Sequence, residues 1–130
     1  MADQLYHYTC GHSVKGIRRE GKLTPNRHPL LGMLELVWLT DLDIPDVDAL
    51  GLTSHILKCR RTEYRATVDA ADAVQAMHWP KLARHLRLTT GDQQILAGVR
   101  ELESAPGARP MHWWVAFSPV PVTALEAVTR

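Results

Sequence analysis

Polar and apolar side chains alternate near the start of the chain, in a stretch rich in aromatic and β-branched residues. This pattern is typical of a short β-strand. Because successive side chains of a strand point to opposite faces, Leu5, His7 and Thr9 are expected on one face. Tyr6 and Tyr8 would point to the other. The first strand is therefore predicted to present a histidine and a threonine side by side.

Three or four later runs predict further strands. Residues 36–40 form a compact apolar run, which indicates a buried strand, and residues 64–69 alternate so that Arg65 emerges on one sheet face. Residues 111–117 are strongly aromatic, and the two adjacent tryptophans in this run must point to opposite faces. Residues 122–128 fit either a last strand or a short helix, since Ala, Leu and Glu favour a helix.

Helices are expected between these strands. Residues 13–20 predict one helix, with Ser13 as its N-cap and Gly21 as the residue after its end. Residues 70–88 are rich in helix formers but contain Pro80. Because proline lacks an N–H and clashes inside a helix, two short helices broken near Pro80 are expected there.

A further helix is expected over residues 92–103, capped by Thr90 or Asp92. The remaining segments predict extended connections, turns, loops or short helical starts. They are residues 23–25, 26–32, 41–48, 49–54 and 104–110. Short strands with interspersed helices indicate an α+β fold.

The composition indicates one globular domain over residues 1–130. About 45% of the 130 residues are hydrophobic and 22% are charged, which excludes a disordered chain. The formal net charge of +1 gives no reason to expect a nucleic acid or an anionic membrane as partner.

The chain has no run of 18 apolar residues, so no membrane-spanning helix is expected. Its polar, acidic start also differs from a signal peptide. We therefore expect a cytoplasmic protein in which Cys10 and Cys59 stay reduced.

Standard motifs for phosphate cradles, hydrolytic serines and metal sites are absent. There is no G-x-G-x-x-G or Walker sequence and no G-x-S-x-G. Cys10 and His12 are close in sequence, and His78 and His85 lie two helical turns apart, but no C-x-x-C or H-E-x-x-H accompanies them. No bound metal is expected.

The first strand carries the most suggestive chemistry. His7 could donate a hydrogen bond from one ring nitrogen and accept one at the other, between tyrosines whose rings could stack on an aromatic ligand. The alternative is a half-buried edge strand whose histidine is simply hydrogen-bonded. Thr40 ends its strand where sites are often built, although it could equally end a core strand at a loop.

Basic and aromatic residues later in the chain add candidates. The run of residues 58–61 and the following Arg65 could hold phosphates, because guanidinium groups bind them bidentately. A solvated basic turn is the alternative. In the run that begins at His112, one tryptophan could line a pocket while its neighbour lies in the core.

Four segments together resemble the start of small ADP-ribosyltransferase-like proteins, in the branch whose first motif is His-Tyr. Their sequences are LYHYT, IRREG, LTP and VWLT, at residues 5–9, 17–21, 23–25 and 37–40. The resemblance covers residues 5–40 by motif and the remainder by general layout. It implies two small, roughly orthogonal antiparallel sheets with flanking short helices and a central cleft.

The resemblance also implies that the cleft binds NAD as a substrate. His7 would hold the nicotinamide ribose, and the implied catalytic residues are His7, Thr40 and Arg65. The implied NAD-binding residues are His7, Tyr8, Thr9, Trp38, Arg65 and His112. The family also carries an acidic or polar catalytic residue on a late strand, and here Glu126 lies in the ambiguous last element.

The predicted function is therefore the NAD-dependent transfer of ADP-ribose to a protein or nucleic acid, with a toxin-like role among the options. Breaking the nicotinamide bond passes through an oxocarbenium-like state, so the enzyme must fix the ribose and stabilise positive charge. One alternative is a non-catalytic module that binds a nucleotide or a partner in the same cleft. Another is an NAD-dependent RNA 2′-phosphotransferase, for which His7, Arg60, Arg65 and His112 supply the residue types.

Overall fold

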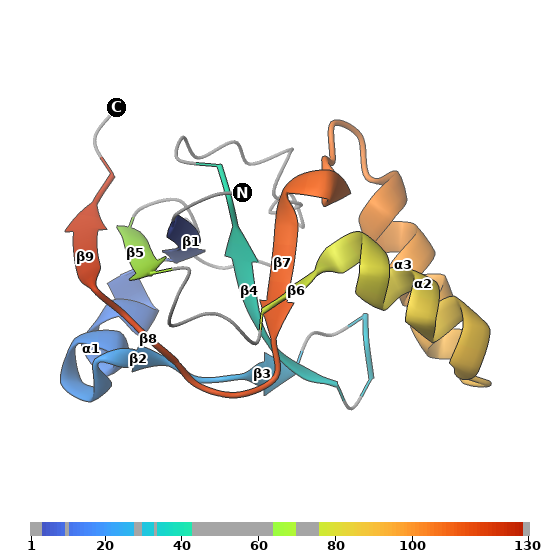
Figure 1. The fold of residues 1–130 in the computed structure, drawn as a ribbon, viewed down its shortest axis with the longest axis horizontal. Coiled ribbons are helices and arrows are strands. Elements are labelled where there is room, and N and C mark those ends of the chain that lie inside the picture. Colours follow the sequence, from blue (N-terminus) through green and yellow to red (C-terminus); the bar gives the residue numbers. More distant parts are fainter. Residues whose placement is uncertain are drawn as a thin grey trace.

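The computed structural model describes residues 4–9, 11–27, 30–32, 34–42, 64–69 and 76–128. These residues form an α+β fold with three α-helices and two antiparallel sheets (Figure 1), which confirms the α+β part of the prediction. None of the helices in these ranges is long and apolar enough to cross a membrane. The predicted segment of residues 49–54, most of 41–48, and Cys10, Cys59 and Arg60 lie outside the described residues.

The larger sheet has seven strands, six of them in the order β6-β7-β4-β1-β5-β9, while β3 pairs with β4 off this path. Its strands are β1 (Gln4–Thr9), β3 (Asn26–Arg27), β4 (Glu35–Thr40), β5 (Tyr64–Asp69), β6 (Met77–His78), β7 (Trp113–Ala116) and β9 (Ala124–Ala127). The smaller sheet pairs β2 (Lys22–Leu23) with β8 (Val120–Pro121).

The larger sheet consists of two halves that meet at one point. β1 pairs with β5 along its whole length, from Gln4↔Asp69 to Thr9↔Tyr64. In the described part of the chain, β1 pairs with β4 at a single position, Tyr6↔Thr40. In Figure 1, β4 and β7 lie along the plane of the view while β1 and β5 are foreshortened. We refer to the meeting point of Tyr6 and Thr40 as the β1–β4 junction.

Two hydrophobic cores pack on opposite faces of β4 and β7. Successive residues of these strands belong to different cores. On β4, for example, Leu39 lies in the first core and Leu36 lies in the second. The first core joins both halves of the sheet, and its fully buried members include Ala66 and Val68 of β5. Trp113 lies in the second core and Trp114 packs against the first, so the prediction that these neighbours face opposite ways is confirmed.

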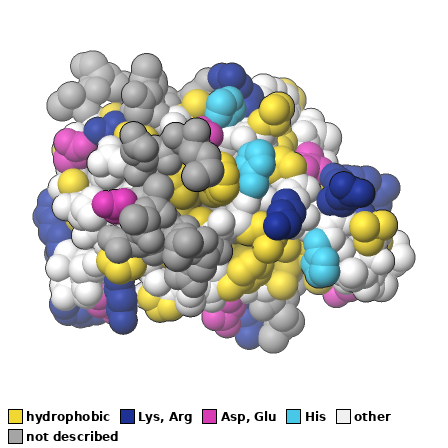
Figure 2. All heavy atoms as spheres, viewed as in Figure 1, with side chains coloured by type: hydrophobic (Ala, Val, Ile, Leu, Met, Phe, Trp, Pro, Cys, Tyr) yellow, Lys and Arg dark blue, Asp and Glu magenta, His cyan; other side chains and the backbone are white. Residues whose placement is uncertain are grey.

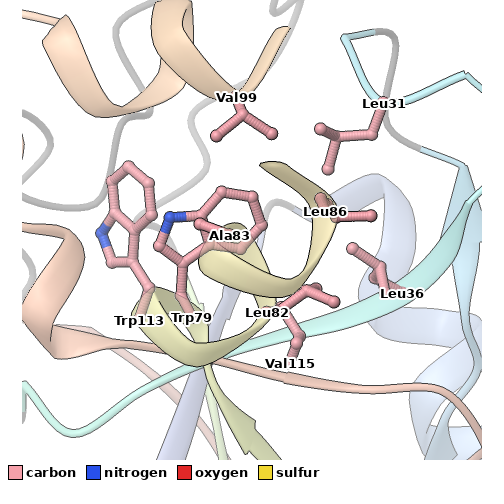
Figure 3. Packing of buried hydrophobic residues seen from close by; sticks show 9 residues of the cluster. All are labelled: Leu31, Leu36, Trp79, Leu82, Ala83, Leu86, Val99, Trp113 and Val115. Carbon is pink, nitrogen blue, oxygen red and sulfur yellow. The ribbon is translucent and has the colours of Figure 1, made fainter. Parts of the chain in front are cut away.

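The second core is covered by two helices, α2 (Trp79–Thr89) and α3 (Gln93–Ser104). Figure 3 shows the Trp79 and Trp113 indoles side by side, with Val99 of α3 above them. These helices cover the β4–β7 half of the sheet. In Figure 2, Lys and Arg side chains lie at both ends of the face, near α1 and near α2, and also between these ends.

Helix α1 (Gly11–Glu20) ends as predicted and begins earlier than predicted. Gly21 has a positive φ of 70°, and its N–H bonds the carbonyl of Ile17 at 2.7 Å, as expected for the residue after a helix end. Ser13 lies inside the helix, so its prediction as the N-cap is wrong. A capping residue marks a possible start, whereas the backbone hydrogen bonds determine the actual one.

Pro80 marks the start of α2 rather than a break between two helices. Proline is tolerated in the first turn because the N–H it lacks would have no partner there. Met77 and His78 form β6 beside β7, so the prediction of a helix at these two residues is wrong. The expected helix over residues 70–75 lies outside the described residues.

The C-terminal part resolves three further expectations. Asp92 caps α3, since its carboxylate accepts from the N–H groups of Gln94 at 2.9 Å and Ile95 at 3.4 Å. The ambiguous last element is the strand β9, paired with β5. His112 lies in a 3-10 turn, η1 (Pro110–His112), so its prediction as part of a strand is wrong.

Candidate functional site

His7 lies beside the β1–β4 junction and interacts with the backbone of β4. Its Nδ1 is 2.7 Å from the carbonyl oxygen of Trp38. Continuing the register from the junction would place Trp38 opposite Tyr8, and the carbonyl of Trp38 accepts from the imidazole of the neighbouring His7. Because a carbonyl can only accept, Nδ1 must carry a proton, and Nε2 is the acceptor of the neutral ring. The local structure therefore fixes the orientation and the tautomer of His7.

A second group of polar contacts forms where β4 ends. The Thr40 hydroxyl donates to the carbonyl of His112 at 2.8 Å and accepts from the N–H of Leu42 at 3.1 Å. Next to it, Nδ1 of His112 lies 2.6 Å from the Asp41 carboxylate. The Thr40 side chain is 3% exposed. Thr40 therefore stabilises the turn after β4, and its hydroxyl already makes two hydrogen bonds there.

Arg65 lies in a separate cluster with Tyr6, Tyr8 and Glu126. Its guanidinium is 2.5 Å from the Glu126 carboxylate and 5.0 Å from the centre of the Tyr6 ring. The hydrogen bond with Glu126 raises the pKa of Arg65, partial burial opposes this, and a hydrogen bond with Tyr8 adds to the rise. Arg65 therefore carries its charge at any ordinary pH.

Trp38 belongs to a group of three indoles. Its ring centre lies 5.1 Å from that of Trp79 and 6.0 Å from that of Trp113, and these two are themselves 6.0 Å apart. Trp79 and Trp113 are buried whereas Trp38 is half-buried. Trp38 therefore presents part of its surface from a rigid aromatic support.

The structure divides the predicted site residues between two faces of the β1–β5 sheet. His7 pairs with Ala66 and Tyr8 pairs with Arg65, and Ala66 belongs to the first core. Since paired residues share a face and neighbours alternate, His7 lies on the side of the first core. Arg65 and Tyr8 lie on the opposite side. His7 and Arg65 therefore lie on opposite faces of the sheet. The resemblance, in contrast, implied that both residues bind NAD.

Hydrogen bonding and burial decide the position of the two remaining predicted NAD-binding residues of β1, Tyr8 and Thr9. The Tyr8 hydroxyl donates to the carbonyl of Leu42 at 2.9 Å, which connects the Arg65 cluster to the turn after Thr40. Thr9 follows on the face of His7, but it is only 1% exposed and lies in the interior. No group of three or more His, Cys, Asp or Glu within the described ranges is placed to hold a metal ion.

Two acidic residues gain significance from the fold. Glu126 stands on a late strand, but its ion pair with Arg65 places it on the face opposite His7. Asp41 contacts His112, which is 71 positions away in the chain. The sequence offered one signal for Asp41, a polar residue directly after a buried strand, and it singled out His112 separately but gave no signal that the two residues meet.

No protein-family profile, curated protein or solved structure matches this chain.

Proposed function

We propose that this chain binds NAD at the β1–β4 junction and transfers ADP-ribose to a protein or nucleic-acid acceptor, as an ADP-ribosyltransferase-like protein. The observation that carries the proposal is the hydrogen bond from Nδ1 of His7 to the Trp38 carbonyl. It fixes the ring beside the β1–β4 junction in the tautomer that can accept a hydrogen bond from a ribose hydroxyl at Nε2. The orientation exists without a ligand, so binding costs little reorganisation.

Trp38 supports the same proposal. Its half-buried indole is backed by Trp79 and Trp113, and its own carbonyl holds the His7 ring. A flat, rigid surface of this kind suits stacking on the nicotinamide ring. The indole lies on the second-core face of β4 and His7 lies on the side of the first core, so a ligand that contacts both must pass around the β1–β4 junction.

The arrangement of the sheet is also in favour of the proposal. Among the described residues its two halves pair at the β1–β4 junction through Tyr6 and Thr40, and Nδ1 of His7 bonds the Trp38 carbonyl beside this pair. The resemblance implies a cleft between two sheets with a histidine of the first strand at its edge. Arg65 faces away from His7 and is paired with Glu126 and Tyr8, so the proposed NAD site is centred on His7 and Trp38 without Arg65.

The proposed chemistry is the displacement of nicotinamide from C1′ of the ribose. The bond to nicotinamide lengthens before the acceptor bond forms, so positive charge develops on the ribose. His7 would hold a ribose hydroxyl while Trp38 holds the leaving ring. Fixing both groups lowers the entropic part of the barrier.

The test is isothermal calorimetry with NAD, together with an assay of nicotinamide release. We expect the unaltered protein to bind NAD and His7→Ala to bind it about tenfold more weakly, the value of one hydrogen bond of 1–1.5 kcal/mol. His85→Ala is the matched control, because His85 is exposed on α2. Thermal melts of both variants check that the fold is kept. Absence of NAD binding by the unaltered protein would refute the proposal.

A binding module without turnover is the second candidate, and one observation favours it. The carboxylate of Glu126 is paired with Arg65 on the face opposite His7, so it is not placed to stabilise a ribose held there. Such a module would bind NAD with the same dependence on His7 and release no nicotinamide. The two measurements above therefore separate the candidates.

A further inference from the structure

Asp41 and His112 form a hydrogen-bonded pair at the end of β4. The Nδ1 atom of His112 lies 2.6 Å from Oδ1 of Asp41, and the two side chains are 31% and 26% exposed. A carboxylate can only accept, so Nδ1 carries the proton and Nε2 of the neutral ring is a base. The same carboxylate stabilises the imidazolium that forms when Nε2 takes a proton.

The backbone of His112 is held independently of its ring. Its N–H donates to the carbonyl of Arg109 at 3.0 Å, and its carbonyl accepts from the Thr40 hydroxyl at 2.8 Å and the Asp41 N–H at 3.4 Å. Pro110 restricts the backbone of the same turn. Because ring and backbone are both anchored, the direction of Nε2 is set before any ligand arrives.

The pair flanks the same part of β4 as His7. Thr40 is opposite Tyr6 on one side and opposite Trp113 on the other. His7 follows Tyr6, and His112 precedes Trp113. His7 and His112 therefore lie to either side of the same end of β4, at the site proposed for NAD.

We propose that Asp41 and His112 are the general-base pair of this site, an inference that rests on the proposed function. The oxygen of the attacking group, water in the simplest case, forms a bond to C1′ of the ribose. The bond from C1′ to nicotinamide breaks, and its electron pair leaves with nicotinamide. The proton of the attacking oxygen passes to Nε2 of His112 and then to solvent. His112 is the catalytic residue of this step, and Asp41 is the positioning residue.

The experiment measures NAD binding by calorimetry and nicotinamide release from NAD in water, with and without added imidazole. His112→Ala should bind NAD within about threefold of the unaltered protein and release nicotinamide about 100-fold more slowly, the lower end for a lost general base. Imidazole should restore part of the rate, because the partly exposed position admits it. His112→Gln keeps a donor toward Asp41 and should be folded and slow.

The controls distinguish a base from a structural histidine. Asp41→Ala should slow release without rescue by imidazole, while His85→Ala should change neither measurement. A normal rate in His112→Gln would overturn the inference and leave the proposed function standing. A slow His112→Ala that imidazole fails to rescue would also overturn it. If the unaltered protein neither binds NAD nor releases nicotinamide, the proposed function and this inference fall together.

Discussion

Gly98 is the position at which one added methyl group should disturb the fold most clearly. A Cβ built on this residue of α3 would overlap the carbonyl oxygen of Leu30 and lie 2.7 Å from its carbonyl carbon and 3.1 Å from its Cβ. Carbon atoms prefer separations of about 3.5–4.0 Å and the carbonyl oxygen lies closer still, so α3 and the turn at Leu30 must move apart by more than about 1 Å. Leu31 and Val99, both fully buried in the second core, would then lose contacts.

Two opposing terms set the expected size of the effect. Overpacking of a core costs about 1–3 kcal/mol, whereas replacing glycine by alanine inside a helix returns about 1 kcal/mol. The extreme overlap with a backbone oxygen puts Gly98→Ala at the upper end of the cost. We expect the free energy of unfolding to fall by about 2 kcal/mol.

Gly16→Ala is the matched control in α1, because nothing lies within 4 Å of a Cβ at that position. This variant should gain about 0.5–1 kcal/mol from helix propensity alone. Urea unfolding followed by tryptophan fluorescence measures both variants. The reasoning is wrong if Gly98→Ala unfolds at or above the urea midpoint of the unaltered protein while Gly16→Ala is stabilised.

Substitutions at three other sites, two of them with a control variant, test hydrogen bonds and packing by urea denaturation. Thr40→Val removes a buried hydroxyl that both donates and accepts, and should cost about 1–3 kcal/mol; an unchanged midpoint would contradict its role in the turn. Asp92→Ala removes the cap of α3 and should lower the free energy of unfolding by about 1 kcal/mol. Asp92→Asn should keep most of that stabilisation, because asparagine is also a good N-cap. Trp79→Ala empties a fully buried site and should cost about 3–5 kcal/mol, against less than about 0.5 kcal/mol for Leu88→Ala on the exposed side of α2.

The strands of the main sheet were predictable because their alternation is a local property. The runs at residues 36–40 and 64–69 became β4 and β5 with shifts of at most one residue. The last element was not decidable, because Ala, Leu and Glu prefer a helix and only the pairing with β5 makes it a strand. Met77 and His78 were mistaken for helix for the same reason, since β7 pairs with them.

The candidate site was predictable only in part. The alternation correctly separated His7 from Tyr8, whereas the role predicted for Thr40 at the polar end of β4 stays a prediction, since the structure shows its hydroxyl bonded within the turn. The sequence could not show that Arg65 pairs with Tyr8 and therefore faces away from His7, because that depends on the register of two strands far apart in the chain. The contact between Asp41 and His112 depends on tertiary structure in the same way.

The division of the main sheet at the β1–β4 junction also sorts the natural chromophores of the protein. The four tryptophans lie on β4, α2 and β7, whereas the three tyrosines lie on β1 and β5. Tryptophan emission therefore reports on one half of the sheet, and tyrosine absorbance near 280 nm, once corrected for tryptophan, reports largely on the other. Coincident unfolding curves from the two signals would mean that a sheet joined through one residue pair and a shared core melts as one cooperative unit. Separated curves would make each half its own unit of stability, with the proposed ligand site at the boundary between them.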